Sequence, residues 1–423
     1  MKNSKTKILI AAFMLFGAVT AYAQFPSIQY FRYNDKRGVN VFETSKEDSV
    51  KYEGTRIRVG GDFAMQFQGI SQTNAGIAGG ASDDLVELAN NFSLPTANLN
   101  FDVQLADGVR MHLRTYLSSR HHTEAYVKGG YMQIDKLDFI SPGFLSDFMD
   151  IATIQVGMDE INYGDTHFRR SDNARAIFNP FVGNYIMDSF TTEPHLEVTV
   201  QNNGLIGVVG LSNGRLNQSP VKGDDGRVFY LKLGYDKQMN DDLRFRLTGS
   251  YYSSSSDGTR DYIYNGDRAG ARYYNVLEGV NNGGSDFAGR FNPGFGYHSA
   301  FQINPFVKFQ GLEFFGVFEK TTNGDDAVGG DFTQTGAEIL YRLGSTERLY
   351  IGGRYNAVTG KSADAAATRD IKRTNFGFGW FMTDNILMKT EYVSQKYEGD
   401  GWNTNIAQGA EFDGLVIEAV IAF

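Results

Sequence analysis

Residues 56–68, RIRVGGDFAMQFQ, decide the fold because apolar and polar side chains alternate along them. Successive side chains of a β-strand point to opposite faces of its sheet, so alternation with a period of two predicts a strand. One face of this strand carries Ile57, Val59, Phe63, Met65 and Phe67, and the other carries Arg56, Arg58, Asp62, Gln66 and Gln68. The segment therefore predicts a strand with one apolar face and one wet face.

The same alternation recurs along the rest of the chain, for example near residues 110 and 245. Each such run predicts a strand, which gives sixteen: 56–70, 95–106, 109–120, 125–138, 151–158, 190–201, 204–213, 227–237, 243–254, 297–309, 312–321, 332–343, 347–359, 371–382, 386–397 and 411–423. Strands with an apolar outer face and a polar inner face are typical of a transmembrane antiparallel β-barrel. We therefore expect an all-β barrel of about sixteen strands.

The connections between these segments fall into two alternating classes. Tight turns are expected at 106–108, 202–204, 310–311, 344–346 and 383–385, and longer polar loops lie between them. Short periplasmic turns and long extracellular loops are the usual pattern of outer-membrane barrels. One connection at the end of the barrel with the tight turns, residues 139–150, is longer and is expected to hold a short helix. An even number of strands places both termini at the periplasmic end.

The last predicted strand, residues 411–423, supports this interpretation. Leu415, Ile417, Ala419, Ile421 and Phe423 form one apolar face that ends in a terminal aromatic residue. Such an ending resembles the signature by which outer-membrane barrels are recognised for assembly. The alternative is a strand that ends a soluble domain, but 58 aromatic residues (33 Phe, 23 Tyr and 2 Trp) are many for the outer faces of a soluble sandwich.

The N-terminus predicts export. Lys2, Lys5 and Lys7 precede an apolar run over 8–18 and the small-residue tripeptide at 21–23, which is the order of a cleavable signal peptide spanning residues 1–23. There is no cysteine, so neither disulfides nor a lipoprotein anchor are expected. Cleavage removes three of the 40 Lys and Arg residues, leaving 37 against 49 acidic residues, a net charge of −12. That balance argues against nucleic acid as a partner.

The loop after the fifth predicted strand, residues 159–187, is the main candidate for function because it is rich in both signs of charge. Charged rings in a narrow passage bias which ions enter. By analogy with sixteen-stranded general porins, in which the corresponding loop folds into the lumen, we expect this loop to narrow the pore. The alternative is that these residues pair with one another and hold the shape of the loop. The candidate constriction residues are Asp159, Glu160, Asp165, His167, Arg169, Arg170, Asp172 and Arg175.

Four arginines are predicted to project from the barrel wall into the lumen: Arg110, Arg114, Arg244 and Arg246. Arginine binds carboxylate and phosphate groups through paired hydrogen bonds, so these residues are candidates for attracting anions. The alternative is that they pair with lumen acids such as Asp102 and stiffen the barrel.

Two further segments have less specific predictions. Residues 24–55 are expected to form a periplasmic extension that lies against the barrel mouth. Residues 255–296 form the longest predicted extracellular loop, rich in Gly, Asn, Asp and Tyr, and are expected to be a solvated lid, with shaping of the pore entrance as the alternative.

An enzyme is not expected. His121-His122 and His298-Ser299 are adjacent pairs, and neighbouring residues on a strand point to opposite faces. No nucleophile motif and no metal-ligand spacing is present, so neither a cofactor nor a metal is predicted.

Three stretches resemble outer-membrane porins of Bacteroidota, a group distantly similar to the phosphate-selective porins: DKRGVNVFE at 35–43, INYGDTHFRRSDN at 161–173 and NPFVGN at 179–184. The resemblance implies a sixteen-stranded barrel, passive conduction and a homotrimer. Phosphate selectivity does not carry over, because the basic cluster of the phosphate channels has no matching positions here.

The sequence thus predicts an outer-membrane porin through which small hydrophilic solutes and ions diffuse, surrounded by lipid and lipopolysaccharide. One alternative is an adhesin or binding protein that contacts its partner through external loops. Another is a channel with a preference for anions such as phosphate.

Overall fold

A computed structural model describes residues 26–76, 84–117, 126–172, 175–214, 226–255, 263–264, 272–280, 287–403 and 405–423. The predicted signal peptide and the His121-His122 pair lie outside these residues.

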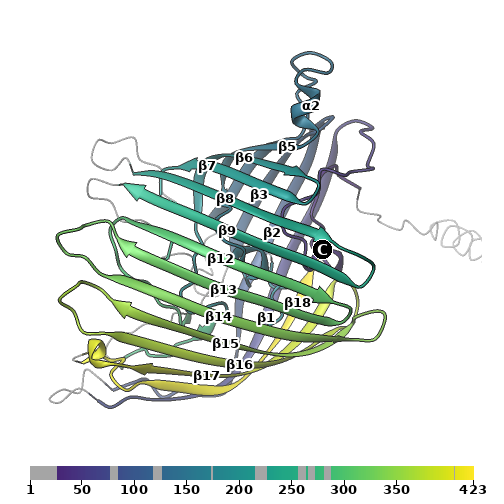
Figure 1. Ribbon diagram of the computed structural model, residues 1–423. Helices are drawn as coiled ribbons and strands as arrows, with labels where there is room; N and C mark the ends of the chain where they lie inside the picture. The colour runs from purple at the N-terminus through teal and green to yellow at the C-terminus, as the bar shows by residue number, and fades with distance from the viewer. Residues whose placement is uncertain are drawn as a thin grey trace, which may run out of the picture.

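Sixteen antiparallel strands close into a single barrel, which confirms the predicted fold class (Figure 1). The barrel strands are β1 (Arg56–Thr73), β2 (Asn91–Ala106), β3 (Val109–Leu117), β4 (Tyr126–Ile134), β5 (Ala152–Glu160), β6 (Thr192–Asn202), β7 (Leu205–Ser212), β8 (Arg227–Gln238), β9 (Leu243–Ser255), β12 (His298–Phe309), β13 (Leu312–Asn323), β14 (Asp331–Leu343), β15 (Leu349–Lys361), β16 (Arg369–Phe381), β17 (Ile386–Glu398) and β18 (Glu411–Ala422). Two short strands, β10 (Tyr273–Tyr274) and β11 (Phe287–Ala288), pair separately from the barrel.

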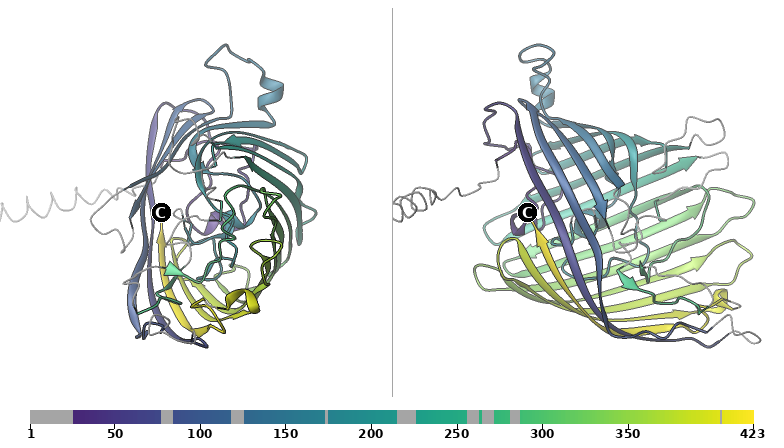
Figure 2. Two further views of the ribbon diagram at one scale, coloured as in Figure 1. Left: turned by 90° about the vertical axis from the view of Figure 1, so that its left-hand side faces the viewer. Right: turned by 180° about the vertical axis from the view of Figure 1, so that it is seen from behind.

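The first and last strands close the barrel. Strand β18 pairs antiparallel with β1, with Phe63 opposite Ile421, and the terminal carbonyl of Phe423 accepts the backbone N–H of Gly61 at 3.0 Å. The C-terminus lies at the end of the barrel that carries the tight turns, as the right-hand view of Figure 2 also shows.

In the part of the chain that the structure describes, helical structure is limited to short segments. These are α2 (Ser146–Met149) and the 3₁₀ turns η1 (Lys36–Gly38), η4 (Thr166–Arg169) and η6 (Asp400–Trp402). The helix predicted in the connection 139–150 is therefore present as one turn. Within the described ranges, no helix has the length and apolar character needed to cross a membrane.

The predicted alternation is the physical basis of the wall. On β1 the apolar side chains Ile57, Phe63 and Met65 face outward and are exposed, whereas Arg58 and Asp62 face inward and are buried. On β18 the same division separates exposed Leu415 and Ile421 from buried Glu418. The barrel thus has an apolar outside and a polar inside, as a transmembrane barrel requires.

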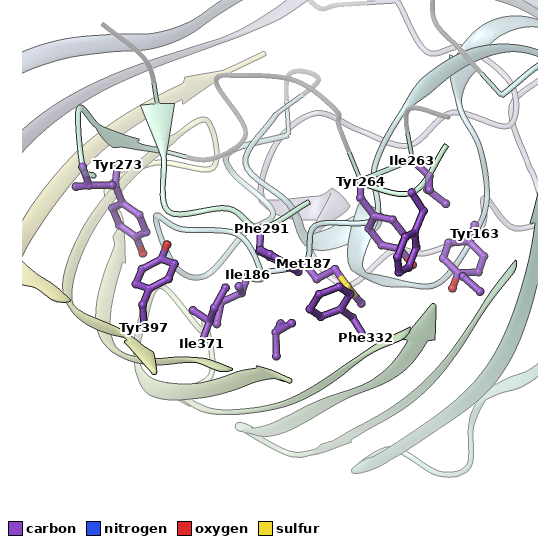
Figure 3. Close-up of a cluster of buried hydrophobic side chains, with 14 of the residues drawn as sticks. Tyr163, Ile186, Met187, Ile263, Tyr264, Tyr273, Phe291, Phe332, Ile371 and Tyr397 are labelled. Atoms are coloured by element: carbon purple, nitrogen blue, oxygen red, sulfur yellow. The ribbon is translucent and has the colours of Figure 1, made fainter. Parts of the chain in front are cut away.

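Three segments occupy the inside of the ring of strands, as the left-hand view of Figure 2 shows. They are part of the N-terminal extension (residues 26–55), whose Glu47, Lys51, Tyr52 and Glu53 are exposed, and the described parts of the inward loop (residues 161–191) and of residues 256–297. Apolar side chains of the two loops pack against inward-facing residues of the wall (Figure 3). The labelled residues include Ile186, Met187, Tyr264 and Phe291 from the loops and Phe332, Ile371 and Tyr397 from the wall.

This cluster corrects the prediction of a solvated lid at 255–296. Ile263, Tyr264, Tyr273 and Phe291 are buried, and Phe291 donates its backbone N–H to the carbonyl of Ile186 at 2.7 Å. Burying these aromatic side chains removes large apolar areas from water. The free energy gained in this way favours the packed loop over a solvated one. The described parts of this loop therefore belong to the lumen.

Candidate functional site

The inward loop is bound to the inner face of strands β12 to β17. Asn356 of β15 accepts the backbone N–H of Ile186 at 2.6 Å, and Gln334 of β14 accepts that of Met187 at 2.8 Å. From β17, Lys389 donates to the backbone carbonyl of Phe181 at 3.0 Å. The loop thus crosses one half of the inner wall, and it also reaches the opposite half, β1 to β6, through the ion pair of Asp172 with Lys128 of β4.

A charged junction joins the inward loop, the N-terminal extension and the wall. Arg246 of β9 donates to Asp165 from Nε and from Nη2, both at 2.8 Å, and to Glu43 from Nη1 at 2.7 Å. Lys232 of β8 lies 3.0 Å from the same Asp165 carboxylate. All four side chains are almost completely buried, so their charges are compensated within the protein.

This junction shifts the pKa values of the loop and extension residues. Burial alone would raise the pKa of Glu43, but the positive charges of Arg246 and Lys232 outweigh burial and hold it at about 2. The same two charges lower the pKa of Asp165 against the effect of its burial. Burial, reinforced by Lys232, lowers the pKa of His167 to about 3, so its imidazole is neutral at physiological pH.

Four of the predicted constriction residues form ion pairs that hold the loop in place, and they border neither of the two cavities described below. Besides Asp165, Arg169 forms an ion pair with Glu338 of β14, and Asp172 forms one with Lys128 of β4. Arg170 pairs with Asp188 of the same loop at 2.7 Å and stacks on the Phe190 ring.

The other four predicted loop residues border a cavity. Asp159 accepts from Arg114 of β3 at 2.9 Å, and Glu160 forms an ion pair with Arg175. His167 Nε2 lies 3.0 Å from the Asn162 side-chain oxygen. Burial, and after it the charge of Arg114, lowers the pKa of Arg175 to about 10, so this guanidinium keeps its charge at neutral pH. These four residues therefore border a cavity, and their role in a constriction stays a prediction.

Two cavities lie between the inward loop, the N-terminal extension and the β1 to β6 wall. The larger, about 130 Å³, is lined by the acids Glu43, Asp159, Glu160 and Glu197, the basic residues Arg32, His167 and Arg175, and the neutral polar residues Thr44, Gln133, Thr153, Gln155, Asn162, Thr199 and Gln201. The smaller, about 70 Å³, is lined by five arginines, Arg32, Arg58, Arg110, Arg114 and Arg175, and by one acid, Asp102. Arg32, Tyr131 and Arg175 border both cavities.

Comparison with solved structures identifies the architecture. An anion-selective porin from Comamonas acidovorans superposes with a TM-score of 0.53 at 9% identity, over 87% of this chain and 100% of that one. The trimer form of OmpT, an outer-membrane protein of Vibrio cholerae, gives 0.53 at 9% identity over 88% and 100%. The outer-membrane channel DcaP of Acinetobacter baumannii gives 0.52 at 10% identity over 88% and 99%.

The fold is that of a porin. Identities near one in ten establish the barrel architecture and nothing finer. No protein-family model and no curated protein matches the sequence.

The four wall arginines separate into two pairs in this porin fold. Arg110 and Arg114 border the smaller cavity, and Arg110 lies 3.6 Å from Asp102, the acid suggested as its partner. Arg244 and Arg246 bind Asp236 and the charged junction and border neither cavity. The structure therefore brings the first pair, but not the second, next to Arg175.

Sequence reasoning did not select Arg32 or Arg58 as site residues. Among the described residues, Arg32 donates only to the backbone carbonyls of Gly38 and Phe168, and its Nη1 has no hydrogen-bond partner. One signal was available: the stretches 35–43 and 161–173, which carry the family resemblance, meet at the charged junction. No group of three or more His, Cys, Asp or Glu side chains in the described part of the chain could hold a metal ion.

Proposed function

We propose that this protein is an outer-membrane channel through which small hydrophilic solutes diffuse passively. The outer face of the barrel is apolar and the inner face polar, and sixteen strands are enough to surround an aqueous passage. The inward loop narrows that passage. The signal peptide over 1–23, the periplasmic position of both termini and a surrounding of lipid and lipopolysaccharide form part of this proposal.

The observation that carries the proposal is the position of the two cavities. Both lie between the inward loop and the β1 to β6 wall, and Asn100 of β2, which borders the smaller cavity, has a side-chain oxygen with no hydrogen-bond partner among the described residues. Buried polar atoms of this kind are costly unless water or a solute reaches them. We therefore place the route for solutes along this half of the wall.

We further propose that the channel prefers anions, because five arginines and one aspartate line the smaller cavity. A passage with one predominant sign of charge raises the local concentration of ions of the opposite sign. Carboxylate and phosphate groups are the anionic groups whose geometry best fits paired guanidinium donors. The net negative charge of the chain does not oppose this preference, because the electrostatic potential inside the cavity is set mainly by the residues that line it.

The reversal potential across a potassium chloride gradient tests both proposals. Purified barrels in a planar bilayer should reverse near the chloride potential, and the double variant Arg110→Gln/Arg114→Gln should move the reversal toward zero. Lys372→Gln is the matched control, because Lys372 is an exposed cation that pairs with Glu398 on the outer surface. A wild-type reversal near the potassium potential removes the anion preference, and the absence of any current removes the channel.

The adhesin remains the second candidate because three segments occupy the lumen, and the larger cavity among the described residues is only about 130 Å³. A closed barrel that binds partners through its outer loops would look similar. Deletion of residues 256–297 separates the two functions. A channel should conduct more after this deletion, since the described part of the segment fills lumen space, whereas a closed adhesin should lose its ligand.

We also propose that the channel assembles as a homotrimer. The family resemblance implies this state, and one structural neighbour is a trimer form. Cross-linking of the protein in its native membrane, followed by gel electrophoresis, tests the assembly directly.

A further inference from the structure

The connection between β4 and β5 projects from the barrel, unlike the other turns at that end. It contains α2 and projects upward, above β5, in Figure 1, and in the left-hand view of Figure 2 it lies outside the ring of strands. The neighbouring hairpins β2-β3 and β6-β7 turn within two residues, at 107–108 and 203–204. A longer connection is not needed to join the two strands, so its extra residues require another explanation.

Five large apolar side chains of this connection are exposed: Phe139, Ile140, Phe144, Leu145 and Phe148 are each between 41% and 58% exposed. Leaving such side chains in water is unfavourable in proportion to the apolar area exposed. Clusters of exposed apolar residues mark contact surfaces. Leu145 also adopts a left-handed backbone conformation, with φ at 52°, which is unfavourable for a residue with a Cβ atom.

The connection is fixed to the barrel at its base. Met149 of α2 is buried in a small cluster with Ile134 and Ala152, the residues at the adjoining ends of β4 and β5. Asp138 accepts the backbone N–H of Gly143 at 2.8 Å, which closes the turn before the helix. The exposed apolar side chains are therefore held in position and do not belong to a loose tail.

The apolar surface of the connection continues the outer face of the barrel. Met132 of β4 and Val156 of β5 face outward beside its base and are exposed like the rest of the outer wall. Three acidic residues, Asp138, Asp147 and Asp150, are exposed on the same connection. An apolar set flanked by charges fits the boundary between lipid headgroups and acyl chains, and the acidic charges favour zwitterionic over anionic lipid.

We propose that residues 137–148 are a lipid anchor. Their apolar side chains lie at the boundary between headgroups and acyl chains, in the leaflet at the end of the barrel where the C-terminus lies. The anchor rests on the proposed function only in that the barrel must span a membrane. Its role is to fix the depth and tilt of the β4 to β5 side of the barrel in the bilayer.

The absence of cysteine makes the test direct, because single cysteines can carry a nitroxide label without background reaction. Ile140→Cys, Phe144→Cys and Phe148→Cys are labelled in the full chain reconstituted in phosphatidylethanolamine and phosphatidylcholine vesicles. Electron paramagnetic resonance then measures label collisions with oxygen, which dissolves in lipid, and with a nickel chelate, which stays in water. Asp147→Cys is the matched control on the charged side, and Phe378→Cys on the outer wall of β16 reports insertion of the barrel.

We expect high oxygen and low nickel collision rates at positions 140, 144 and 148, as at 378, and the reverse at 147. Nickel access at the three positions, together with lipid contact at 378, would overturn the anchor and leave the membrane barrel intact. Low collision rates with both reagents would also overturn it, since they would show contact with a protein such as a second copy. Nickel access at 378 would instead count against the barrel as a membrane protein.

Discussion

Arg246 on the barrel wall holds Asp165 of the inward loop through two parallel hydrogen bonds of 2.8 Å. The same guanidinium also binds Glu43 of the N-terminal extension at 2.7 Å. One wall residue thus fixes the two segments that, together with the β1 to β6 wall, enclose the cavities. The dimensions of the proposed passage depend on this arrangement.

Asp165→Asn should destabilise the barrel by about 3–5 kcal/mol, because it leaves the buried charges of Arg246 and Lys232 without their main partner. Unfolding in urea, followed by the gel mobility shift between folded and unfolded barrel, measures the loss. Glu398→Gln is the control, since the pair of Glu398 with Lys372 is exposed and screened by water, so its loss should change the stability little. Equal losses in the two variants would show that the junction is not a stabilising element.

Stability should fall as the pH is lowered, in two ranges. The pKa of His167 in the folded protein is about 3, below its ordinary value of 6.5. Between these two pH values this histidine binds a proton in the unfolded chain but not in the folded one, so lowering the pH favours unfolding. The folded pKa of Glu43 is about 2, below its ordinary 4.5, so the stabilisation present above pH 4.5 is lost toward pH 2. Thermal unfolding from pH 7 to pH 2 measures both.

His167→Gln should remove the upper range and keep the lower, because glutamine does not titrate. A variant that keeps the wild-type loss between pH 6.5 and 4.5 would contradict the assignment of that range to His167.

Gly164→Ala should displace the inward loop from its position against the barrel wall. Gly164 has a φ of 65°, and a Cβ atom there would overlap the side-chain amide of Gln302 on the wall. We expect lower thermal stability and larger, noisier single-channel currents. Gly296→Ala serves as the control, because a Cβ there meets no atom within 4 Å. Wild-type currents in Gly164→Ala would show that the loop does not limit the passage.

Deletion of residues 26–44 should increase conductance, because Arg32, Phe42 and Glu43 line the cavities from the side of the extension. Single-channel recording measures the change. Glu43→Gln separates loss of the charge from loss of the segment and should change conductance less. An unchanged conductance after the deletion would place the route for ions elsewhere in the barrel.

The strands were predictable because their signal is local. The segment predicted at 312–321 is β13 over Leu312–Asn323, and that at 386–397 is β17 over Ile386–Glu398. A lipid-facing wall imposes a period of two on each strand regardless of its neighbours, so each strand can be read without knowing the rest.

The contents of the lumen were less predictable, because they depend on contacts between distant segments. The sequence indicated a charged loop after β5, but whether Arg169 or Arg175 borders a cavity depends on Glu338 of β14 and Glu160 of β5. The fully buried Val182, Ile186 and Met187 were an unused signal, since a solvated loop rarely needs several apolar residues. The tyrosines and phenylalanines of 263–295 gave the same indication.

If ions pass between the inward loop and the β1 to β6 wall, a reagent attached in that space should block the current. Asn100→Cys places the only thiol of the chain at the smaller cavity, and Phe378→Cys places one on the outer face. Addition of a methanethiosulfonate reagent during single-channel recording should reduce the current through the first variant and leave the second unchanged. An undiminished current through fully labelled Asn100→Cys, or a folded barrel that carries no current, would contradict the account.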